Sequence, residues 1–240
     1  MKNPEVEVCL SPVLYDFHHD PQAITVVVDI FRSTSAIPTA LKKNVKKMIP
    51  VGPLEKAEQY AKDGFLVAGE RNGVQLDFAH FGNSPLIFID NPEVAGKTIV
   101  YCTTNGTQAI EKARNSYLVL LGSWLNMSSL CGELIRKGRK TILLCSGWKG
   151  KYNLEDTLFA GALAEKLENN GFSLSCDAAV SAKHLWNASR NDLFNVIKDT
   201  SAYKRLSSLG YHDEIEYCLQ KDTLNVIPVL IDGFLVPLKN

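Results

Sequence analysis

Four apolar stretches of this chain each end in a short polar loop, and this pattern constrains the fold more than any other feature. The stretches are residues 24–29, 65–69, 98–102 and 141–145. An apolar run of five or six residues that leads into a helical pattern is typical of a buried parallel strand followed by a crossover helix. In open α/β sheets, ligands bind outside the carboxyl ends of the strands. We therefore expect the four loops to meet at one site.

The rest of the chain repeats the alternation of strand and helix. Further strands are predicted at 6–10, 46–51, 117–121, 225–231 and 234–236. Helices are predicted at 33–43, 54–62, 107–114, 126–137, 154–169, 178–186, 191–209 and 214–219. Such alternation predicts an α/β fold, with a layered, mostly parallel β-sheet, flanking helices and a site at the carboxyl ends of the strands.

The predicted domain organisation is one compact α/β unit over residues 1–240. A chain of 240 residues is long enough for one large unit or for two modest lobes, and no linker or low-complexity segment divides it. An alternative comes from an internal similarity, because residues 25–37 align with residues 98–110. Two similar α/β lobes, split near residues 115–125, would also account for the sequence.

Composition excludes two classes of function and favours one compartment. Lys plus Arg equals Asp plus Glu, at 26 each, whereas a general nucleic-acid binder needs a basic surplus. The longest apolar runs are far too short to span a membrane. The six cysteines form no Cys-x-x-Cys pair. We expect all six to be reduced, in a cytoplasmic protein.

The loop after the stretch at 24–29 combines charge with hydroxyl groups. Asp29 ends the strand, Arg32 follows, and Ser33, Thr34 and Ser35 open a helix. Helix N-termini present free N–H groups and a positive dipole end, which suit phosphate. Arg can add bidentate contacts to an oxyanion. The alternative is a simple helix cap beside a surface salt bridge, but a cap needs only one hydroxyl.

The loop at 103–107 repeats this pattern without charge. Thr103 and Thr104 supply hydroxyls, Asn105 an amide, and Gly106 allows a close approach of the backbone to a ligand. Asn-Gly is also a common turn signal, so an ordinary turn remains the alternative.

Two further motifs flank an irregular segment at 70–92. Glu70 resembles Asp29 in its placement at a strand end, and Arg71 beside it could bind an anion or only pair with it. Asn83 and Ser84 lie at the other end of the segment. A segment of this length without periodicity indicates either a functional loop or a short embedded element.

The start of the predicted helix at 154–169 has two interpretations. Asn153 can cap the helix, with Asp156 three residues later as in a capping box. The first turn also aims Glu155 or Asp156 at the end of the sheet where the other loops meet.

Five ordered motifs together resemble those of the 2-phosphosulfolactate phosphatases. They are VVVDIFRST at 26–34, GERNG at 69–73, FGNSP at 81–85, TTNGT at 103–107 and LEDTLFAGA at 154–162. The tail, with LSSLGY at 206–211, Asp213 and VIP at 226–228, also resembles the end of these proteins. The resemblance implies an α/β fold unlike the common phosphatase folds. It also implies a magnesium-dependent hydrolase that converts (2R)-2-phospho-3-sulfolactate into (2R)-3-sulfolactate and phosphate, a step of coenzyme M biosynthesis.

Within this hypothesis, the motif residues take three roles. The Mg²⁺ ligands, directly or through water, would be Asp29, Glu70 and Asp156, which with Arg32 form the predicted catalytic set. Groups holding the phosphoryl oxygens would be Arg32, Ser33, Thr34, Thr104 and Asn105, with Thr103 and Gly106 completing the loop. The second anionic end of the substrate would contact Arg71, Asn83 and Ser84.

Two departures from the family pattern leave the substrate open. The first motif has Phe31 and Ser33 where the family more often has an aliphatic residue and Ala, and the loop at 145–152 is bulkier and more basic. The alternatives are a Mg²⁺-dependent phosphatase of another small phosphorylated hydroxy acid, or a non-catalytic protein that binds a phosphorylated metabolite. The expected partner is a small anionic substrate, without nucleic acid or membrane. The sequence leaves a homo-oligomer open.

Overall fold

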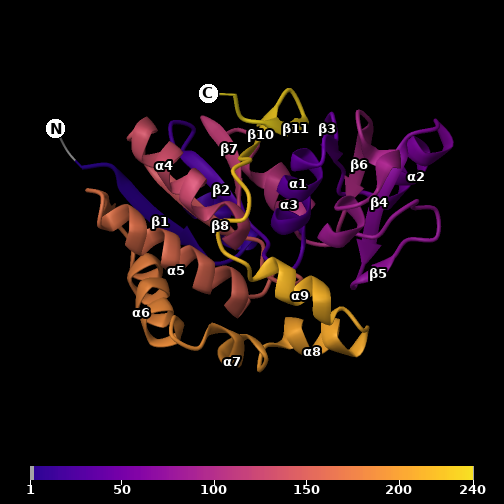
Figure 1. Ribbon diagram of the computed structural model, residues 1–240. Helices are drawn as coiled ribbons and strands as arrows, with labels where there is room; N and C mark the ends of the chain where they lie inside the picture. Colours follow the sequence, from indigo (N-terminus) through magenta and orange to yellow (C-terminus); the bar gives the residue numbers. More distant parts are fainter. Residues whose placement is uncertain (1–2, 240) are drawn as a thin grey trace.

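The computed structural model describes residues 3–239, and it forms a long twisted sheet with helices on its faces (Figure 1). The strands are β1 (Glu5–Cys9), β2 (Ile24–Val28), β3 (Lys47–Pro50), β4 (Leu66–Arg71), β5 (Val74–Gln75), β6 (Thr98–Cys102), β7 (Leu118–Gly122), β8 (Thr141–Cys145), β9 (Ser173–Leu174), β10 (Pro228–Ile231) and β11 (Phe234–Pro237). The α-helices are α1 (Ser33–Lys42), α2 (Leu54–Lys62), α3 (Gly106–Ala113), α4 (Met127–Lys137), α5 (Leu154–Glu168), α6 (Asp177–Ser189), α7 (Leu193–Ile197), α8 (Ser201–Ser208) and α9 (His212–Cys218). Short 3₁₀ helices are η1 (Pro12–Phe17), η2 (Pro85–Phe88), η3 (Pro92–Val94) and η4 (Trp124–Asn126).

The sheet consists of two parallel halves joined by an antiparallel hairpin. Its order is β5-β4-β6-β3-β11-β10-β7-β2-β8-β1-β9. Strands β4, β6 and β3 are mutually parallel, as are β7, β2, β8, β1 and β9. The hairpin of β10 and β11 lies between the halves and pairs antiparallel with both of them. The predicted α/β class with a mostly parallel sheet is therefore confirmed.

Twist explains how both halves deliver strand ends to one place. Three successive antiparallel pairings separate β7 from β3, so the halves would run in opposite directions in a flat sheet. Neighbouring strands rotate by about 20–25°. Over the five steps from β2 to β6 this accumulates to roughly 110°, which leaves β2 and β6 crossing at roughly 70°. Contacts described below show that their carboxyl ends meet.

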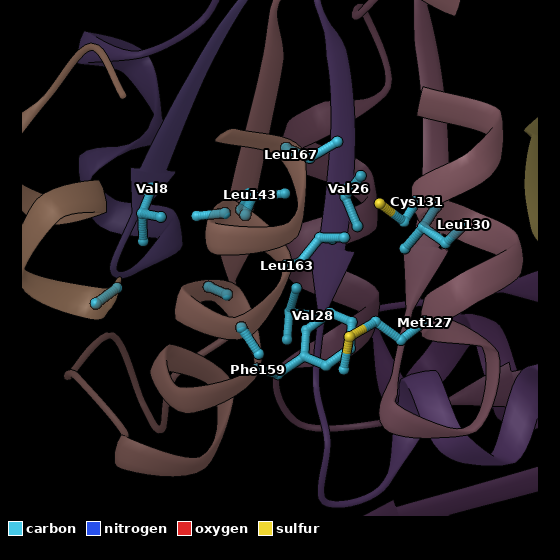
Figure 2. Packing of buried hydrophobic residues seen from close by; sticks show 14 of the residues in the cluster. Val8, Val26, Val28, Met127, Leu130, Cys131, Leu143, Phe159, Leu163 and Leu167 are labelled. Carbon is cyan, nitrogen blue, oxygen red and sulfur yellow. The ribbon is translucent and has the colours of Figure 1, made fainter. Parts of the chain in front are cut away.

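The larger half has a core built between the sheet and two helices. Side chains four residues apart on α5 form one apolar face, and alternate residues of β2 point towards it. Figure 2 shows the packing of Phe159, Leu163 and Leu167 of α5, Val26 and Val28 of β2, Leu143 of β8, and Met127, Leu130 and Cys131 of α4. A second cluster, around α1, α3 and η2, covers the other face. These layers fix the starts of α1, α3 and α5 against the strand ends.

Most predicted elements are present, and one prediction is wrong. The single helix expected at 191–209 is two helices, α7 and α8, because Thr200 caps a new helix start by accepting a hydrogen bond from the Tyr203 N–H at 3.0 Å. The irregular segment at 70–92 contains the short elements β5 and η2, whereas the sequence does not predict β9, η1 or η4. All six cysteines are free thiols. No helix within residues 3–239 is both long and apolar enough to cross a membrane.

The halves of the sheet do not follow one cut in the sequence. Strands β1 and β2 lie with β7 and β8, on the far side of the hairpin from β3 to β6. The predicted lobe boundary at 115–125 contains β7, and β1 and β2 precede this boundary in the chain although they lie in the same half of the sheet as β7 and β8. The predicted unit of 1–240 includes residues 1, 2 and 240, which lie outside the described residues.

Candidate active site

A small cavity lies where the carboxyl ends of the two half-sheets meet. Six of the predicted site residues line it, namely Asp29, Arg32, Ser33, Glu70, Asn83 and Asn105. Its volume is about 20 Å³, which is room for about one water molecule. Larger hollows of about 780 and 740 Å³ lie elsewhere on the surface, but none of the predicted site residues lines them.

The loop between β2 and α1 is held by its own hydroxyl groups. Thr34 accepts the backbone N–H of Asp29 through Oγ1 at 3.0 Å, and Ser35 donates through Oγ to the carbonyl of Ile30 at 3.1 Å. The Phe31–Arg32 peptide bond is cis. Thr34 therefore braces the loop, whereas Ser33 lines the cavity. The hydroxyls of Thr34 and Ser35 thus fix the loop that carries Ser33 and Asp29.

Two helix starts meet at this cavity, one from each half of the sheet. Ser33 opens α1, and Gly106 opens α3. The Oγ of Ser33 lies 3.3 Å from Oγ1 of Thr103, across the two loops. A Cβ on residue 106 would come within 2.5 Å of Ser33 Oγ and 2.7 Å of Asp29 Oδ2. Glycine is thus required at this position by the approach of the other loop.

Glu70 joins the end of β4 to the loop after β6. Its Oε1 accepts the backbone N–H of Thr104 at 2.8 Å and the hydroxyl of Thr104 at 3.0 Å. Its Oε2 accepts the backbone N–H of Gly73 at 2.6 Å. Both carboxylate oxygens therefore have donors, and Thr104 positions Glu70 from outside the cavity wall.

Asp156 joins two other loops, and the predicted capping box is absent. Its Oδ1 accepts the N–H of Ile30 at 2.9 Å, and its Oδ2 accepts the N–H of Gly147 at 3.2 Å. The side chain of Asn153 makes no capping hydrogen bond, although Asn153 occupies the N-cap position. That prediction is wrong because the carboxylate is drawn to backbone donors of neighbouring loops rather than to its own helix. Asp156 is buried behind the cavity and fixes the loop that carries Asp29.

Buried carboxylates give the site its electrostatic character. Burial raises the pKa of Asp29 to about 6, with Glu70 adding to the rise against a lowering hydrogen bond from Ser33. Burial also raises the pKa of Glu155 to about 7, with a contribution from Asp29. The pKa of Asp156 is raised by burial and by the charges of Asp29 and Glu155. Negative charge is thus unfavourable here unless a cation compensates it.

The two predicted arginines are placed differently. Arg32 is buried, lines the cavity, lies over the ring of Tyr211 at 4.3 Å and donates one bond to the carbonyl of Gly73 at 3.3 Å. Arg71 donates to the carbonyls of Gly52 at 2.6 Å and Glu70 at 2.9 Å, outside the cavity lining. Its guanidinium group therefore braces the backbone in this structure.

The remaining predicted residues divide in the same way. Asn83 lines the cavity, and its buried Oδ1 has no hydrogen-bond partner within residues 3–239. Ser84 instead caps η2 by accepting the N–H of Leu86 at 3.2 Å. Asn105 lines the cavity while its Oδ1 accepts the N–H of Lys149 at 3.0 Å. Asn83 is thus the member of this group with an unused acceptor beside the cavity.

The predicted metal ligands surround the cavity without forming a ready cage. Asp29 follows β2, Glu70 lies near the end of β4 and Asp156 lies in the first turn of α5, and the last two have donors on both oxygens. Among the residues that the structure describes, no three His, Cys, Asp or Glu side chains lie close enough together to hold a metal ion. The metal set remains a prediction.

The comparison with known proteins decides the family. The family model described as 2-phosphosulpholactate phosphatase matches residues 9–233. The chain belongs to the 2-phosphosulfolactate phosphatase family. The family is named for a phosphoric monoester hydrolase, and the match includes every motif that carried the resemblance in the sequence.

Relatives from the 2-phosphosulfolactate phosphatase family are similar over nearly their whole length. A protein of Caldanaerobacter subterraneus subsp. tengcongensis is 37% identical over 212 residues, covering 87% of this chain and 88% of its own. One from Thermotoga maritima is 37% identical over 211 residues, covering 88% and 90%. A third, from Gloeobacter violaceus, is 36% identical over 219 residues, covering 87% and 91%. Each is named a probable 2-phosphosulfolactate phosphatase.

Sequence reasoning missed part of the cavity wall in this family member. Arg205 and Leu206 of α8 line the cavity together with Trp148 from the loop after β8. No local pattern marks Arg205, which is one polar residue on a mostly polar helix. Glu155 enters the sequence reasoning only as an alternative to Asp156, yet its buried Oε2 has no hydrogen-bond partner within the described chain.

Proposed function

We propose that this protein is a magnesium-dependent phosphatase that hydrolyses (2R)-2-phospho-3-sulfolactate to (2R)-3-sulfolactate and phosphate. The observation that carries the proposal is the meeting of two helix starts, Arg32 and buried carboxylates at one cavity, in a chain of the 2-phosphosulfolactate phosphatase family. Helix N-termini and arginine favour a phosphoryl group. Because the carboxylates and the phosphoryl group are both negative, a cation is needed between them.

The donor set fits Mg²⁺. This ion takes oxygen ligands and is usually held by one or two carboxylates, substrate phosphate and several waters, so a complete protein cage is not needed. Asp29 lines the cavity, and Glu155 has a buried oxygen without a partner, which is an unfavourable arrangement unless a ligand uses it. We propose Asp29 and Glu155 as direct ligands. Glu70 and Asp156 would act through water or by fixing the loops.

The residues of the chain would do the rest by positioning and charge. Bound magnesium would neutralise the carboxylates and polarise a phosphoryl oxygen. Arg32 and Ser33 would hold the other phosphoryl oxygens, with the N–H groups of the first turns of α1 and α3 behind them. Water is the proposed nucleophile: it loses a proton as its oxygen bonds to phosphorus, the ester P–O bond breaks, and the ester oxygen takes up a proton and leaves as the hydroxyl of sulfolactate. Uncatalysed phosphate-ester hydrolysis is very slow, so positioning and charge must supply a large effect.

The proposed reaction would place the protein in coenzyme M biosynthesis, where sulfolactate is consumed further. The experiment is a phosphate-release screen over phosphorylated hydroxy acids, with purified protein, in the presence of Mg²⁺ and after exhaustive chelation. We expect release from phosphosulfolactate only with the metal. Full release after chelation would overturn the metal assignment. Binding of the phosphorylated acid without any release would favour a non-catalytic binding protein instead.

A further inference from the structure

Arg205 reaches the cavity from a part of the chain remote from the other site residues. It belongs to α8, which with α7 and α9 runs past the carboxyl ends of the strands (Figure 1). Its guanidinium carbon lies 3.6 Å from the ring centroid of Trp148. This distance is that of a guanidinium stacked on an aromatic face, which holds the plane of the group and leaves its N–H edge free.

One donor of Arg205 is buried and unused among the described residues, in contrast to the paired donors of Arg71. Its Nε is buried and has no hydrogen-bond partner within residues 3–239. Buried donors in native proteins are nearly always paired, so an unpaired one beside a cavity indicates a ligand. Arg71, by comparison, donates to two backbone carbonyls. Of these two arginines, Arg205 is therefore the one prepared to receive an oxyanion.

The charges that face Arg205 also fit this role. Burial lowers the pKa of Arg205, the charges of Glu155, Glu70 and Asp29 oppose this shift, and the charge of Arg32 adds to it. None of these carboxylates forms an ion pair with Arg205 within the ordinary 4.0 Å limit among the described residues. A metal bound to the carboxylates would leave Arg32 and Arg205 as two cationic groups on different walls of one cavity. That arrangement matches a small molecule with two separate anionic groups.

We propose that Arg205, held against Trp148, binds the oxyanion of the substrate that is not transferred, and so determines specificity. This inference rests on the proposed function, because Arg32 is taken to hold the phosphoryl group. The oxyanion is a sulfonate or a carboxylate, which share the geometry that a guanidinium recognises. Because the cavity has room for about one water molecule in this structure, its lining must separate to admit the substrate.

The test compares four phosphate esters with wild-type protein and the Arg205→Met variant. They are phosphosulfolactate, phospholactate without the sulfonate, 2-sulfoethyl phosphate without the carboxylate, and ethyl phosphate with neither. We expect Arg205→Met to lower kcat/KM at least tenfold for esters that carry the recognised anion, mainly through KM, and less than threefold for ethyl phosphate. A loss confined to phosphosulfolactate and 2-sulfoethyl phosphate identifies the sulfonate as the group that Arg205 binds. A loss confined to phosphosulfolactate and phospholactate identifies the carboxylate. Equal loss on all four esters, or no loss, overturns the inference.

Three further variants separate recognition from folding. Arg205→Lys keeps the charge without the planar fork and should recover only part of the loss. Trp148→Phe keeps an aromatic face and should stay within threefold of wild type, whereas Trp148→Ala should reproduce the selective loss. If Trp148→Ala retains full discrimination, the supporting role of Trp148 is wrong. Arg190→Met, at the end of α6 and outside the cavity lining, is the matched control and should leave all four values unchanged.

A binding measurement keeps the inference distinct from the proposed function. Calorimetry with sulfolactate, the proposed product, needs no turnover. If wild type releases phosphate from none of the esters but binds sulfolactate, and Arg205→Met weakens that binding at least tenfold, the proposed function fails while the anion site stands. If wild type is active and Arg205→Met binds sulfolactate as tightly as wild type, the anion site fails while the function stands.

Discussion

Gly106 of α3 and Ser33 of α1 approach so closely that a Cβ on residue 106 would lie 2.5 Å from Ser33 Oγ. The same Cβ would meet Asp29 Oδ2 at 2.7 Å. We therefore predict that Gly106→Ala displaces both groups and lowers kcat/KM by roughly 100-fold, since small misplacements at a reacting centre have effects of that size. The cost in the free energy of unfolding should be only about 1–3 kcal/mol, as for other overpacked positions. Steady-state kinetics and chemical denaturation check both.

Gly132 provides the matched control. It lies on an exposed part of α4, and a Cβ added there would have no neighbouring atom within 4 Å. Gly132→Ala should therefore stabilise the protein by about 0.5–1 kcal/mol through helix propensity and leave turnover unchanged. A Gly106→Ala variant as active as Gly132→Ala would show that the two helix starts are free to separate.

Asp29 and Asp156 should respond differently to the change to asparagine. Asp29→Asn removes a proposed metal ligand and should lower kcat at least about 100-fold, while removing a buried charge and so preserving or raising Tm. Asp156→Asn leaves one carbonyl oxygen for the two N–H donors of Ile30 and Gly147. An unpaired buried N–H costs about 1–3 kcal/mol, so Tm should fall as well as activity. Exposed Asp90 supplies the control, Asp90→Asn. An active Asp156→Asn variant with reduced Tm would confine Asp156 to a structural role.

The metal-free protein should lose stability as the pH rises towards neutrality. The pKa of Asp29 is raised to about 6 from 3.8, and that of Glu155 to about 7 from 4.5, both chiefly by burial. A raised pKa means that the folded state binds more protons than the unfolded state. Protonation therefore stabilises the fold fully below the pKa of the unfolded state, and this stabilisation is lost as the pH rises through the pKa of the folded state. The free energy of unfolding should therefore fall between about pH 4.5 and 7, the interval between the unfolded and the folded pKa values of these two groups.

Chelated protein, denatured with urea across that range, gives the measurement. The pKa of Glu7 is lowered from 4.5, so the protonation of Glu7 changes the free energy of unfolding only below about pH 4.5 and does not disturb the measurement. Asp29→Asn should flatten the profile, and Mg²⁺ at about pH 7.5 should restore stability to the wild type. A profile that rises with pH would contradict the assignment of buried, metal-free carboxylates.

Substitutions of Arg32 and Arg71 should also have different effects on the kinetics. Arg32→Lys loses the planar group beside the phosphoryl site and should lower kcat at least tenfold. Arg71→Lys loses donors to the Gly52 and Glu70 carbonyls and should lower Tm while keeping the preference among phosphate esters. The sequence alone predicts that Arg71 reads the distal anion. A loss of substrate preference in Arg71→Lys would support that prediction and would count against Arg205.

The elements of the fold were predictable where the signal is local. Apolar runs of five residues are sufficient to place β2 and β8 within a residue of their observed bounds, and the helix predicted at 154–169 matches α5 within one residue. The order of the strands was not predictable from the sequence, because β10 pairs with β7, and β11 with β3, although each pair is more than a hundred residues apart in the chain. The break between α7 and α8 did have a local signal in the capping residue Thr200, which was outweighed by the helical pattern around it.

The candidate site was predictable only in its loops. Motifs after the strands identified Asp29, Arg32 and Glu70, because strand-end loops of parallel sheets converge. Which polar group faces the cavity and which braces a loop depends on distant partners. Asp156 bonds to Ile30, 126 residues away in the chain, and Arg205 meets Trp148 only because α8 returns past the sheet. No pattern within either segment records those contacts.

The hairpin of β10 and β11 has a consequence for biosynthesis. Ribosomes deliver chains from the amino end at about 5–20 residues per second, so this hairpin emerges after every other strand of the sheet. Until it does, β3 and β7 present unpaired edges, which are templates for pairing with other chains. Nascent protein would therefore depend on chaperone protection until the hairpin arrives.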